Sequence, residues 1–269
     1  MKASRSKTER AERQVAERVY GLAAAKAAFA ARPDAVVSIA YTESLRHVLA
    51  DMLRNAARRR IAYREVDEDE LGRMAQSVHH EGICLLVQPR SALTPQALLE
   101  SLRERGLLLA LDGVQNPHNV GAILRSAAYF GVRGLIQPAA RTESSQPGMS
   151  LSAAARRVAE GGAEHVPVLR VPELPALLAT AQRAGITIIG SDAHAETSVD
   201  DYRWPARSLL VLGHEQHGLS REARAACQTT LRIAGSEHID SLNVSVAAGI
   251  FLASYVRMHG AGTDGRRKS

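Results

Sequence analysis

The sequence predicts an α/β fold in which helices cover both faces of a parallel sheet. In the second half of the chain, short apolar runs alternate with stretches that have the composition of helices. Nearly continuous apolar strands, such as residues 107–112 and 208–213, are typical of parallel sheets that are buried on both faces. A length of 269 residues and a hydrophobic content of 45% are sufficient for two domains, each with its own core.

The first part of the chain predicts a smaller unit in which strands and helices also alternate. Residues 8–31 are rich in alanine, contain glutamate near their start and stop before Pro33. These features favour a helix. Runs that are rich in β-branched and apolar residues predict strands between further helices. These strands are expected at residues 35–40, 61–66 and 82–87, with helices at residues 42–60 and from residue 67.

From residue 107 onward the same alternation continues, with no internal repeat of solenoid length. Strands are expected at residues 107–112, 132–137, 165–169, 186–190, 208–213 and 230–235. Helices are expected near residues 120–130, 150–160, 173–184 and 219–227, and a last helix at residues 243–259. Strands that alternate with helices in this way indicate a parallel sheet.

Composition and pattern together divide the chain into five parts. We expect a basic tail at 1–15, a small domain at 16–90, a partly helical linker at 91–106, a larger domain at 107–260 and a basic tail at 261–269. Residues 1–32 carry eight Lys or Arg against three Glu, and the last thirteen residues add a net +3, so the middle of the chain is near −2 although the whole chain is +6. Basic ends suit a phosphate-rich partner such as a nucleic acid, or they serve only to keep the protein soluble.

The absence of several sequence motifs argues against several functional classes. The sequence has neither the glycine-rich dinucleotide fingerprint nor a P-loop, which argues against dehydrogenases and nucleotide hydrolases. Cys84 and Cys227 lie far apart and form no zinc spacing with the histidines, so we expect no metal. The first residues lack an apolar signal core, and no apolar run approaches the ~18 residues that span a bilayer. We therefore expect a cytoplasmic protein without a membrane partner.

Three segments of the larger domain are polar where strands are expected to end. Residues 111–127 place Asn119 in a loop and Arg125 on the following helix. Residues 209–220 break an apolar strand at Gly213 and then present Glu215, and residues 232–249 carry polar side chains into the last helix. Ligands of open α/β sheets usually bind beyond the carboxyl ends of strands, so these segments are candidates for a site.

These segments contain three short motifs: N-x-G-x-x-x-R beginning at Asn119, G-x-E-x-x-G-L-S beginning at Gly213, and S-L-N-V-S beginning at Ser241. In this order and spacing they resemble the SpoU/TrmH family of RNA ribose 2′-O-methyltransferases, over roughly residues 107–260. Residues 16–90 are similar to the L30e-like RNA-binding domain that precedes the catalytic domain in many members. The run AEGGAEHV at residues 159–166 looks closest to the YfiF-like members.

The resemblance implies a parallel sheet whose carboxyl-terminal segment is threaded into a trefoil knot. It also implies S-adenosylmethionine as the cofactor, a homodimer, and either ribosomal or transfer RNA as the substrate. The L30e-like domain favours ribosomal RNA. Shape and phosphate contacts are expected to dominate RNA recognition, because aromatic residues make up only 4% of the chain.

By matching positions, the resemblance assigns catalytic roles to five residues. Arg125 would lie nearest the ribose hydroxyl, and we favour a positioning role because a guanidinium stays protonated. Asn119 would fix the entry loop, and Glu215 would accept hydrogen bonds from Asn243 or Arg125. Ser241 and Asn243 would order the cofactor loop. Each of the five also has a purely structural interpretation, as a helix cap, a residue near a helix dipole or a surface ion pair.

For the cofactor, the resemblance points to backbone groups at Gly213, Ile233 and Leu242, with Leu212 beside them. His118, His214 and His217 are less favoured, and we interpret them as solvated loop residues. Asn116 stands where many members of the family carry aspartate.

Two alternatives remain open at this point. The chain could be a non-catalytic RNA-binding protein that keeps a knotted domain, or a knotted methyltransferase that acts on a base nitrogen. The intact motif residues argue against the first alternative, and the S-L-N-V-S segment argues against the second.

Overall fold

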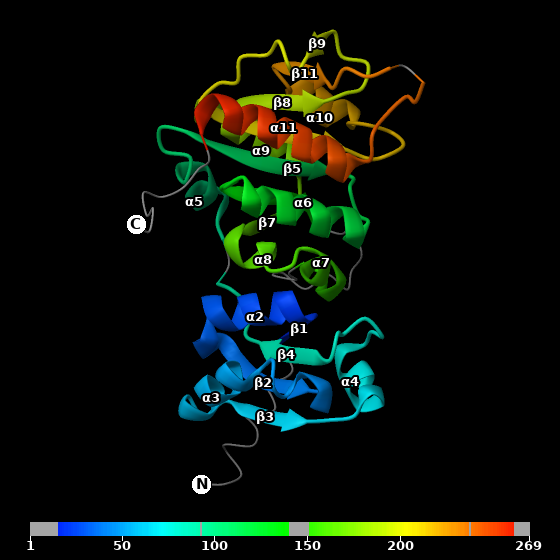
Figure 1. Ribbon diagram of the computed structural model, residues 1–269. Coiled ribbons are helices and arrows are strands. Elements are labelled where there is room, and N and C mark those ends of the chain that lie inside the picture. Colours follow the sequence, from blue (N-terminus) through cyan, green and yellow to red (C-terminus); the bar gives the residue numbers. More distant parts are fainter. Residues whose placement is uncertain (1–15, 92, 140–150, 237, 261–269) are drawn as a thin grey trace. The chain divides into compact units, whose positions relative to one another are not determined.

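The computed structural model describes residues 16–91, 93–139, 151–236 and 238–260 (Figure 1). These residues form two compact units. The N-terminal unit contains residues up to 91 together with residues 151–164, and the C-terminal unit contains the others. The predicted basic tails, at 1–15 and 261–269, lie outside the described residues. In the described ranges, no helix is both long and apolar enough to cross a membrane.

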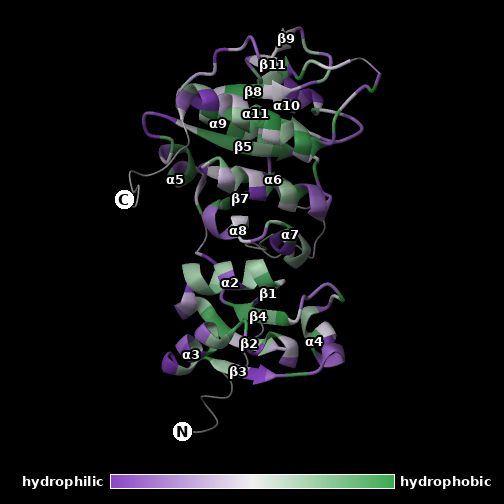
Figure 2. Ribbon diagram, viewed as in Figure 1, coloured by the Kyte–Doolittle hydropathy of each residue, from purple (hydrophilic) through white to green (hydrophobic). Residues whose placement is uncertain are grey.

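The N-terminal unit is built on a four-stranded mixed sheet with the order β1-β4-β2-β3. Its strands are β1 (Glu17–Tyr20), β2 (Val36–Tyr41), β3 (Ala62–Glu65) and β4 (Ile83–Val87). Strand β4 pairs antiparallel with β1 and β2, and β2 pairs parallel with β3. Strand β3 lies at the edge and is exposed along its length, in agreement with its hydrophilic colour in Figure 2.

Helices pack around this sheet, and they are α2 (Leu22–Ala31), α3 (Ala50–Arg58) and α4 (Glu68–Ala75), with short 3₁₀ turns at Pro33–Ala35 and Glu43–Leu45. The helix predicted over residues 8–31 is wrong at residues 17–20, which form strand β1. Pairing with β4 and burial of Val19 and Tyr20 outweigh the local helical composition there. Gly21, with a φ of 92°, then turns the chain into α2.

Residues 151–164 belong to the N-terminal unit although they are remote from it in sequence. They contain α7 (Ala153–Val158) and the start of α8 (Gly162–His165). The Nη2 atom of Arg156 donates to Glu17, and Glu164 accepts from Arg32 and Arg90. We expected one continuous domain at residues 107–260, whereas residues 151–164 pack with the N-terminal unit.

Glu164 is surrounded by arginines and its side chain is only 3% exposed. Burial alone would raise the pKa of Glu164, but the hydrogen bonds and positive charges of Arg32 and Arg90 outweigh burial and hold this pKa below its usual range. The carboxylate therefore stays ionised, and this charged cluster fixes residues 151–164 to the N-terminal unit.

The C-terminal unit is a seven-stranded sheet with the order β7-β6-β5-β10-β8-β11-β9. Its strands are β5 (Gly106–Asp112), β6 (Gly134–Pro138), β7 (Val168–Val171), β8 (Thr187–Ser191), β9 (Thr197–Ser198), β10 (Arg207–Gly213) and β11 (Thr229–Arg232). Every neighbouring pair is parallel. The prediction of a parallel α/β sheet is confirmed.

Helices cover both faces of this sheet, and they are α5 (Pro95–Glu100), α6 (Pro117–Tyr129), α9 (Leu174–Arg183), α10 (Arg221–Ala226) and α11 (Val244–His259). Helices α6 and α11 pack against each other (Figure 1), and α9 packs against α10. Leu108 and Ala110 of β5 share a core cluster with α9. The equally buried Leu107, Leu109 and Leu111 alternate with them and so point to the opposite face. Accordingly, β5 is hydrophobic along its length in Figure 2.

Candidate functional site

The carboxyl ends of β5 and β10 lie side by side in the C-terminal unit. Asp112, the last residue of β5, is paired in register with Gly213, the last residue of β10. The loops that follow these strands contain the first two polar motifs. The sheet therefore brings together two motifs that are about a hundred residues apart in sequence, at the edge where α/β proteins usually bind ligands.

The first motif leaves β5 and enters α6. Asn116 caps this helix, since its Oδ1 accepts a hydrogen bond of 2.9 Å from the backbone N–H of His118. Pro117 occupies the first turn, where no backbone N–H is needed. Asn119 is therefore not the cap of the helix, and its amide makes other contacts. Arg125 is exposed on α6, about 9 Å further along the helix axis at ~1.5 Å per residue.

The second motif makes a tight turn at the end of β10. The backbone groups of His214 and Gly218 exchange two hydrogen bonds of 2.9 Å. A Cβ atom on Gly213 would lie 2.3 Å from the carbonyl carbon of Gly218 and 2.5 Å from the backbone nitrogen of Leu219. Only glycine permits this close approach of two backbone segments.

Asp112 is a residue of the site that the sequence analysis missed. Its Oδ2 accepts a hydrogen bond of 2.6 Å from the backbone N–H of Ser220, which in turn caps α10. The carboxylate therefore ties the end of β5 to the far side of the turn after β10. An acidic residue directly after the apolar run at 107–111 was the available signal.

A chain of hydrogen bonds joins all three motifs. The Nδ2 of Asn243 donates to the Oδ1 of Asn119 over 3.1 Å, and the Nδ2 of Asn119 donates to the Oε1 of Glu215 over 2.7 Å. The Oδ1 of Asn243 accepts from the backbone N–H and the hydroxyl of Ser245, so Asn243 also caps α11. We call Asn119, Glu215 and Asn243 the polar relay. Both amides have their donors and acceptors committed, which fixes their orientation.

The other residues implied by the resemblance lie at the ends of β10 and β11 and just before α11. Ser241 is exposed two positions before Asn243. Leu212 is fully buried at the end of β10, next to Gly213, and Ile233 is half-buried directly after β11. Leu242 is 50% exposed. Strand β8 separates β10 from β11, so Gly213 and Ile233 end strands that are not immediate neighbours.

The histidines of the second motif form a stacked pair. The rings of His214 and His217 lie 4.8 Å apart with an interplanar angle of 24°. The Nδ1 of His214 accepts a hydrogen bond of 3.0 Å from the backbone N–H of Gln216, while His118 is exposed at the start of α6. His214 is thus held in one orientation, which the interpretation as a solvated loop residue did not include.

Neither cysteine is suited to act as a nucleophile at neutral pH. Burial raises the pKa of both the Cys84 and the Cys227 thiols to about 11. Both groups therefore stay protonated at neutral pH. Within the described part of the chain, no group of three or more His, Cys, Asp or Glu residues is arranged to hold a metal ion.

An open depression of about 400 Å³ adjoins the polar relay, and we call it the amide depression. Its walls come from the loops of the first two motifs. It is lined by Gly113, Gln115, Asn116, Asn119, His214, Glu215 and Gln216.

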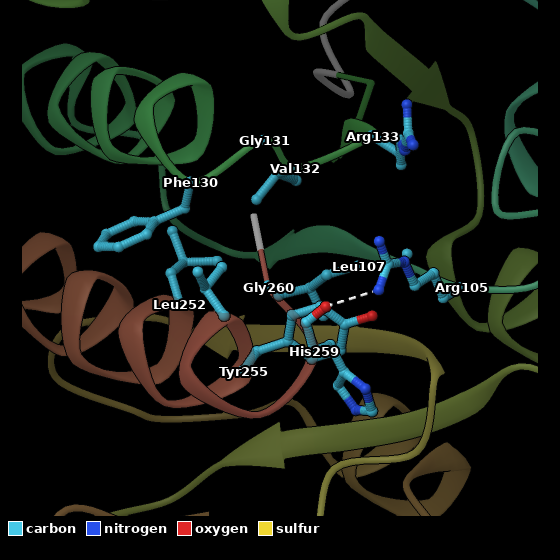
Figure 3. Close-up of a pocket in the computed structure, with 12 residues that line it drawn as sticks. Arg105, Leu107, Phe130, Gly131, Val132, Arg133, Leu252, Tyr255, His259 and Gly260 are labelled. Carbon is cyan, nitrogen blue, oxygen red and sulfur yellow. Dashed lines mark hydrogen bonds between the residues drawn. The ribbon is translucent and has the colours of Figure 1, made fainter. Parts of the chain in front are cut away.

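A more enclosed pocket lies at the opposite end of the strands (Figure 3). It sits at the amino end of β5, between the carboxyl ends of α6 and α11, and Arg105 there donates to the carbonyl of His259 over 2.8 Å. Its volume of about 30 Å³ has room for about one water molecule. Strand β5 separates it from the relay by its whole length, roughly 20 Å at ~3.3 Å per residue. This pocket is a packing void, and the polar motifs mark the site.

Two family profiles match the chain. The profile of the SpoU rRNA Methylase family matches residues 106–253, which carry all three motifs. The chain belongs to the SpoU rRNA methylase family. A second profile, described as RNA 2′-O ribose methyltransferase substrate binding, matches residues 18–93 of this SpoU family member. The resemblance inferred from the motifs is confirmed.

Individual relatives of this SpoU family member agree with the profiles. It is 36% identical over 253 residues to the uncharacterized tRNA/rRNA methyltransferase YfiF of Escherichia coli O157:H7, covering 94% of this chain and 71% of YfiF. It is 34% identical over 244 residues to the 23S rRNA (guanosine-2′-O-)-methyltransferase RlmB of Nitrosomonas europaea, covering 90% of this chain and 91% of RlmB. The crystal structure of the SpoU methyltransferase AviRb from Streptomyces viridochromogenes, in complex with AdoMet, is similar with a TM-score of 0.73 and 27% identity, covering 92% of each chain.

Proposed function

We propose that this protein is an S-adenosylmethionine-dependent RNA methyltransferase that methylates the 2′-hydroxyl of a ribose. The observation that carries the proposal is the polar relay, which joins one residue from each of the three motifs at the carboxyl edge of the parallel sheet. Membership of the SpoU family and the similarity to RlmB, a ribose methyltransferase by name, support this reaction. The substrate-binding profile at residues 18–93 supports an RNA substrate.

The residues that the resemblance assigns to the cofactor suit S-adenosylmethionine. Backbone groups at Gly213 and Ile233 offer donors and acceptors at strand ends, and Leu242 offers apolar surface that is 50% exposed. Leu212 is fully buried directly before Gly213. When bound, S-adenosylmethionine supplies an electrophilic methyl group on a positively charged sulfur. Recognition by backbone and apolar groups needs no charged fingerprint, in keeping with the absence of one from the sequence.

The protein must place a 2′-oxygen in line behind the methyl carbon and help its proton to leave. S-adenosylmethionine, held by Gly213, Ile233 and Leu242, would supply the methyl group that this oxygen receives. Arg125 positions the ribose through its phosphate. Asn119 is locked by Glu215 and Asn243, so it presents a rigid edge to the substrate. Ser241 orders the segment that carries Asn243. The neighbouring phosphate of the RNA accepts the proton.

The proposal includes three finer features that the family resemblance implies. The carboxyl-terminal segment of the C-terminal unit is threaded as a trefoil knot, and the N-terminal unit is an L30e-like RNA-binding domain. Two copies of the chain pair as a homodimer. On α11, Val246, Ile250 and Ala253 are exposed at spacings of four and three residues and so form one strip. An apolar strip of this kind suits contact with a second copy.

The test is to incubate the purified protein with methyl-labelled S-adenosylmethionine and separate pools of ribosomal and transfer RNA, followed by mass spectrometry of the nucleosides. A 2′-O-methylated nucleoside is the expected product, and the labelled pool identifies the RNA class, for which we expect ribosomal RNA. A methylated base would instead indicate a base-modifying enzyme. Cofactor binding without any product in either pool would favour a non-catalytic RNA-binding protein.

A further inference from the structure

We propose that the amide depression holds the base of the nucleotide that is methylated, and that Gln115, Asn116 and Gln216 read the edge of this base. This inference rests on the proposed function, and it names the residues that would select the target nucleotide. The depression opens directly beside the relay, because Asn119 and Glu215 are part of its wall. A base bound there would carry its own ribose to the relay.

The depression has the size of a small-molecule site. Its volume of about 400 Å³ lies within the ~300–1,000 Å³ that is usual for ligand pockets. It is also open to solvent along one side, as a site must be if a nucleotide that remains joined to its RNA chain is to enter. The enclosed void at the other end of the sheet meets neither condition.

The chemistry of the wall favours a base over a phosphate. The lining contains no Lys or Arg, and its single carboxylate, Glu215, already accepts a hydrogen bond from Asn119. Three carboxamides remain, and each can offer donors and acceptors of hydrogen bonds. Neutral groups of this kind recognise the donor and acceptor pattern of base edges. An anionic phosphate would find no counter-charge in this wall.

The carboxamides have hydrogen-bonding groups to spare. In the part of the chain that the structure describes, neither Gln115 nor Gln216 has a hydrogen-bond partner for its side chain, and both residues are exposed. The Oδ1 of Asn116 is used by His118, so Asn116 offers its Nδ2 donor. These amides can form paired hydrogen bonds to the edge of a base, and the fixed donor of Asn116 favours an acceptor at one position.

A rigid ring forms another part of the wall. His214 packs over Gly113, where an added Cβ atom would lie 3.3 Å from the Cβ of His214. The ring of His214 is also stacked on His217 and accepts a hydrogen bond from Gln216. Histidine is one of the side chains on which unpaired RNA bases stack. The turn therefore presents a flat surface and the amide of Gln216 from one short segment.

The experiment begins by mapping the nucleotide that the wild-type protein methylates in transcribed ribosomal and transfer RNA. Four RNA hairpins that differ only at this nucleotide then serve as substrates. We expect the wild type to prefer one hairpin, by kcat/KM, at least tenfold over the others. In the double variant Gln115→Ala/Gln216→Ala this preference should fall tenfold or more, with unchanged melting temperature and unchanged affinity for S-adenosylmethionine. Gln96→Ala, which removes an exposed glutamine on α5, is the matched control and should keep the wild-type preference.

A second variant keeps the size of a side chain while changing its hydrogen bonding. Gln216→Glu removes a donor and retains an acceptor, so it should change the order of preference among the four hairpins. An unchanged preference in both variants would overturn base reading while leaving methyl transfer intact. A loss of cofactor affinity equal to the loss of rate would also overturn it, since the depression would then belong to the cofactor. Absence of any methylated product from the wild type would overturn the proposed function itself.

Discussion

The Nδ2 of Asn243 donates a hydrogen bond of 3.1 Å to the Oδ1 of Asn119, across 124 positions of sequence. This bond places the start of α11 against the first turn of α6. Because Asn119 also donates a hydrogen bond to Glu215, a change at any one of the three residues should disturb the other two.

Replacing Asn119 by aspartate tests this connection. Asn119→Asp keeps an acceptor for Asn243 but removes the donor to Glu215 and sets two carboxylates against each other. We expect the single-turnover rate of methyl transfer to fall about 100-fold, because a lost hydrogen bond to a charged group costs ~1.5–3 kcal/mol and the new like-charge contact adds to this loss. Affinity for S-adenosylmethionine should stay within a few-fold. Asn55→Ala, on α3 of the N-terminal unit, is the control, and a wild-type rate in Asn119→Asp would refute the relay.

Replacing Gly213 by alanine tests the close approach at the end of β10. The added Cβ atom would collide with the backbone of Gly218 and Leu219, so the turn must open. We expect Gly213→Ala to bind S-adenosylmethionine at least tenfold more weakly, as measured by titration calorimetry. Gly72→Ala is the matched control, because a Cβ atom on Gly72 meets its neighbours only at 3.8 Å or more. Equal affinity in both variants would separate this turn from the cofactor site.

Arg125 is predicted to position the RNA rather than the cofactor. Arg125→Ala should abolish detectable methyl transfer and leave the affinity for S-adenosylmethionine largely unchanged. Arg125→Lys keeps the charge but not the planar fork of donors, so it should recover only part of the rate. Arg221→Ala, at the exposed start of α10, provides the control. Turnover at the wild-type level in Arg125→Ala would remove this residue from the mechanism.

The charged cluster of the N-terminal unit should make its stability depend on pH. At pH 7, Glu164→Gln should lower the free energy of unfolding by about 3 kcal/mol, because it removes the buried counter-charge of Arg32 and one of the two carboxylates near Arg156. The folded pKa of Glu164 is depressed, so its contribution is present above the unfolded pKa of ~4.3 and is lost as pH falls through the lower folded value. Urea unfolding at pH 7, 5 and 3.5 should show the difference between wild type and variant shrinking at the lowest pH.

An exposed ion pair gives the control for this measurement. Glu70 pairs with Arg64 at the surface of the N-terminal unit, where both side chains are at least one third exposed. Glu70→Gln should change the free energy of unfolding by less than about 1 kcal/mol at each pH. A difference between wild type and Glu164→Gln that did not vary with pH would mean that the carboxylate of Glu164 is not the source of its stabilisation.

The exposed strip on α11 is where we expect the contact of the proposed dimer. Val246→Glu/Ile250→Glu places two charges on this strip, and we expect it to convert a dimer into a monomer in light scattering coupled to gel filtration. Val78→Glu, which changes the 84% exposed Val78 of the N-terminal unit, should remain dimeric. If the α11 variant remained dimeric, the dimer contact would not lie on this strip.

Much of the fold follows from local pattern, and the exceptions have physical causes. The apolar strands β5 and β10 were predictable because burial on both faces leaves an uninterrupted hydrophobic run. Strand β1 was not, because its pairing with β4, 60 or more residues away, overrides a helical composition. The place of residues 151–164 was also hidden, since the pair of Arg156 and Glu17 joins positions 139 residues apart and leaves no local signal.

The candidate site was predictable in its residues but not in its connections. The motifs identified Asn119, Glu215 and Asn243 through their resemblance to a family, whereas their hydrogen bonds depend on the register of β5 against β10. Asp112 and the two glutamines of the depression were missed because a single acid or amide after a strand has many uses. Only the structure shows which side chains share a wall.

The N-terminal unit combines two separate segments of the chain, and this affects the order in which it can fold during synthesis. Arg90 is synthesised 74 residues before its partner Glu164, about 4–15 s earlier at ~5–20 residues per second. During translation, Arg32 and Arg90 therefore lack the carboxylate of Glu164 until α7 and Glu164 have left the ribosome.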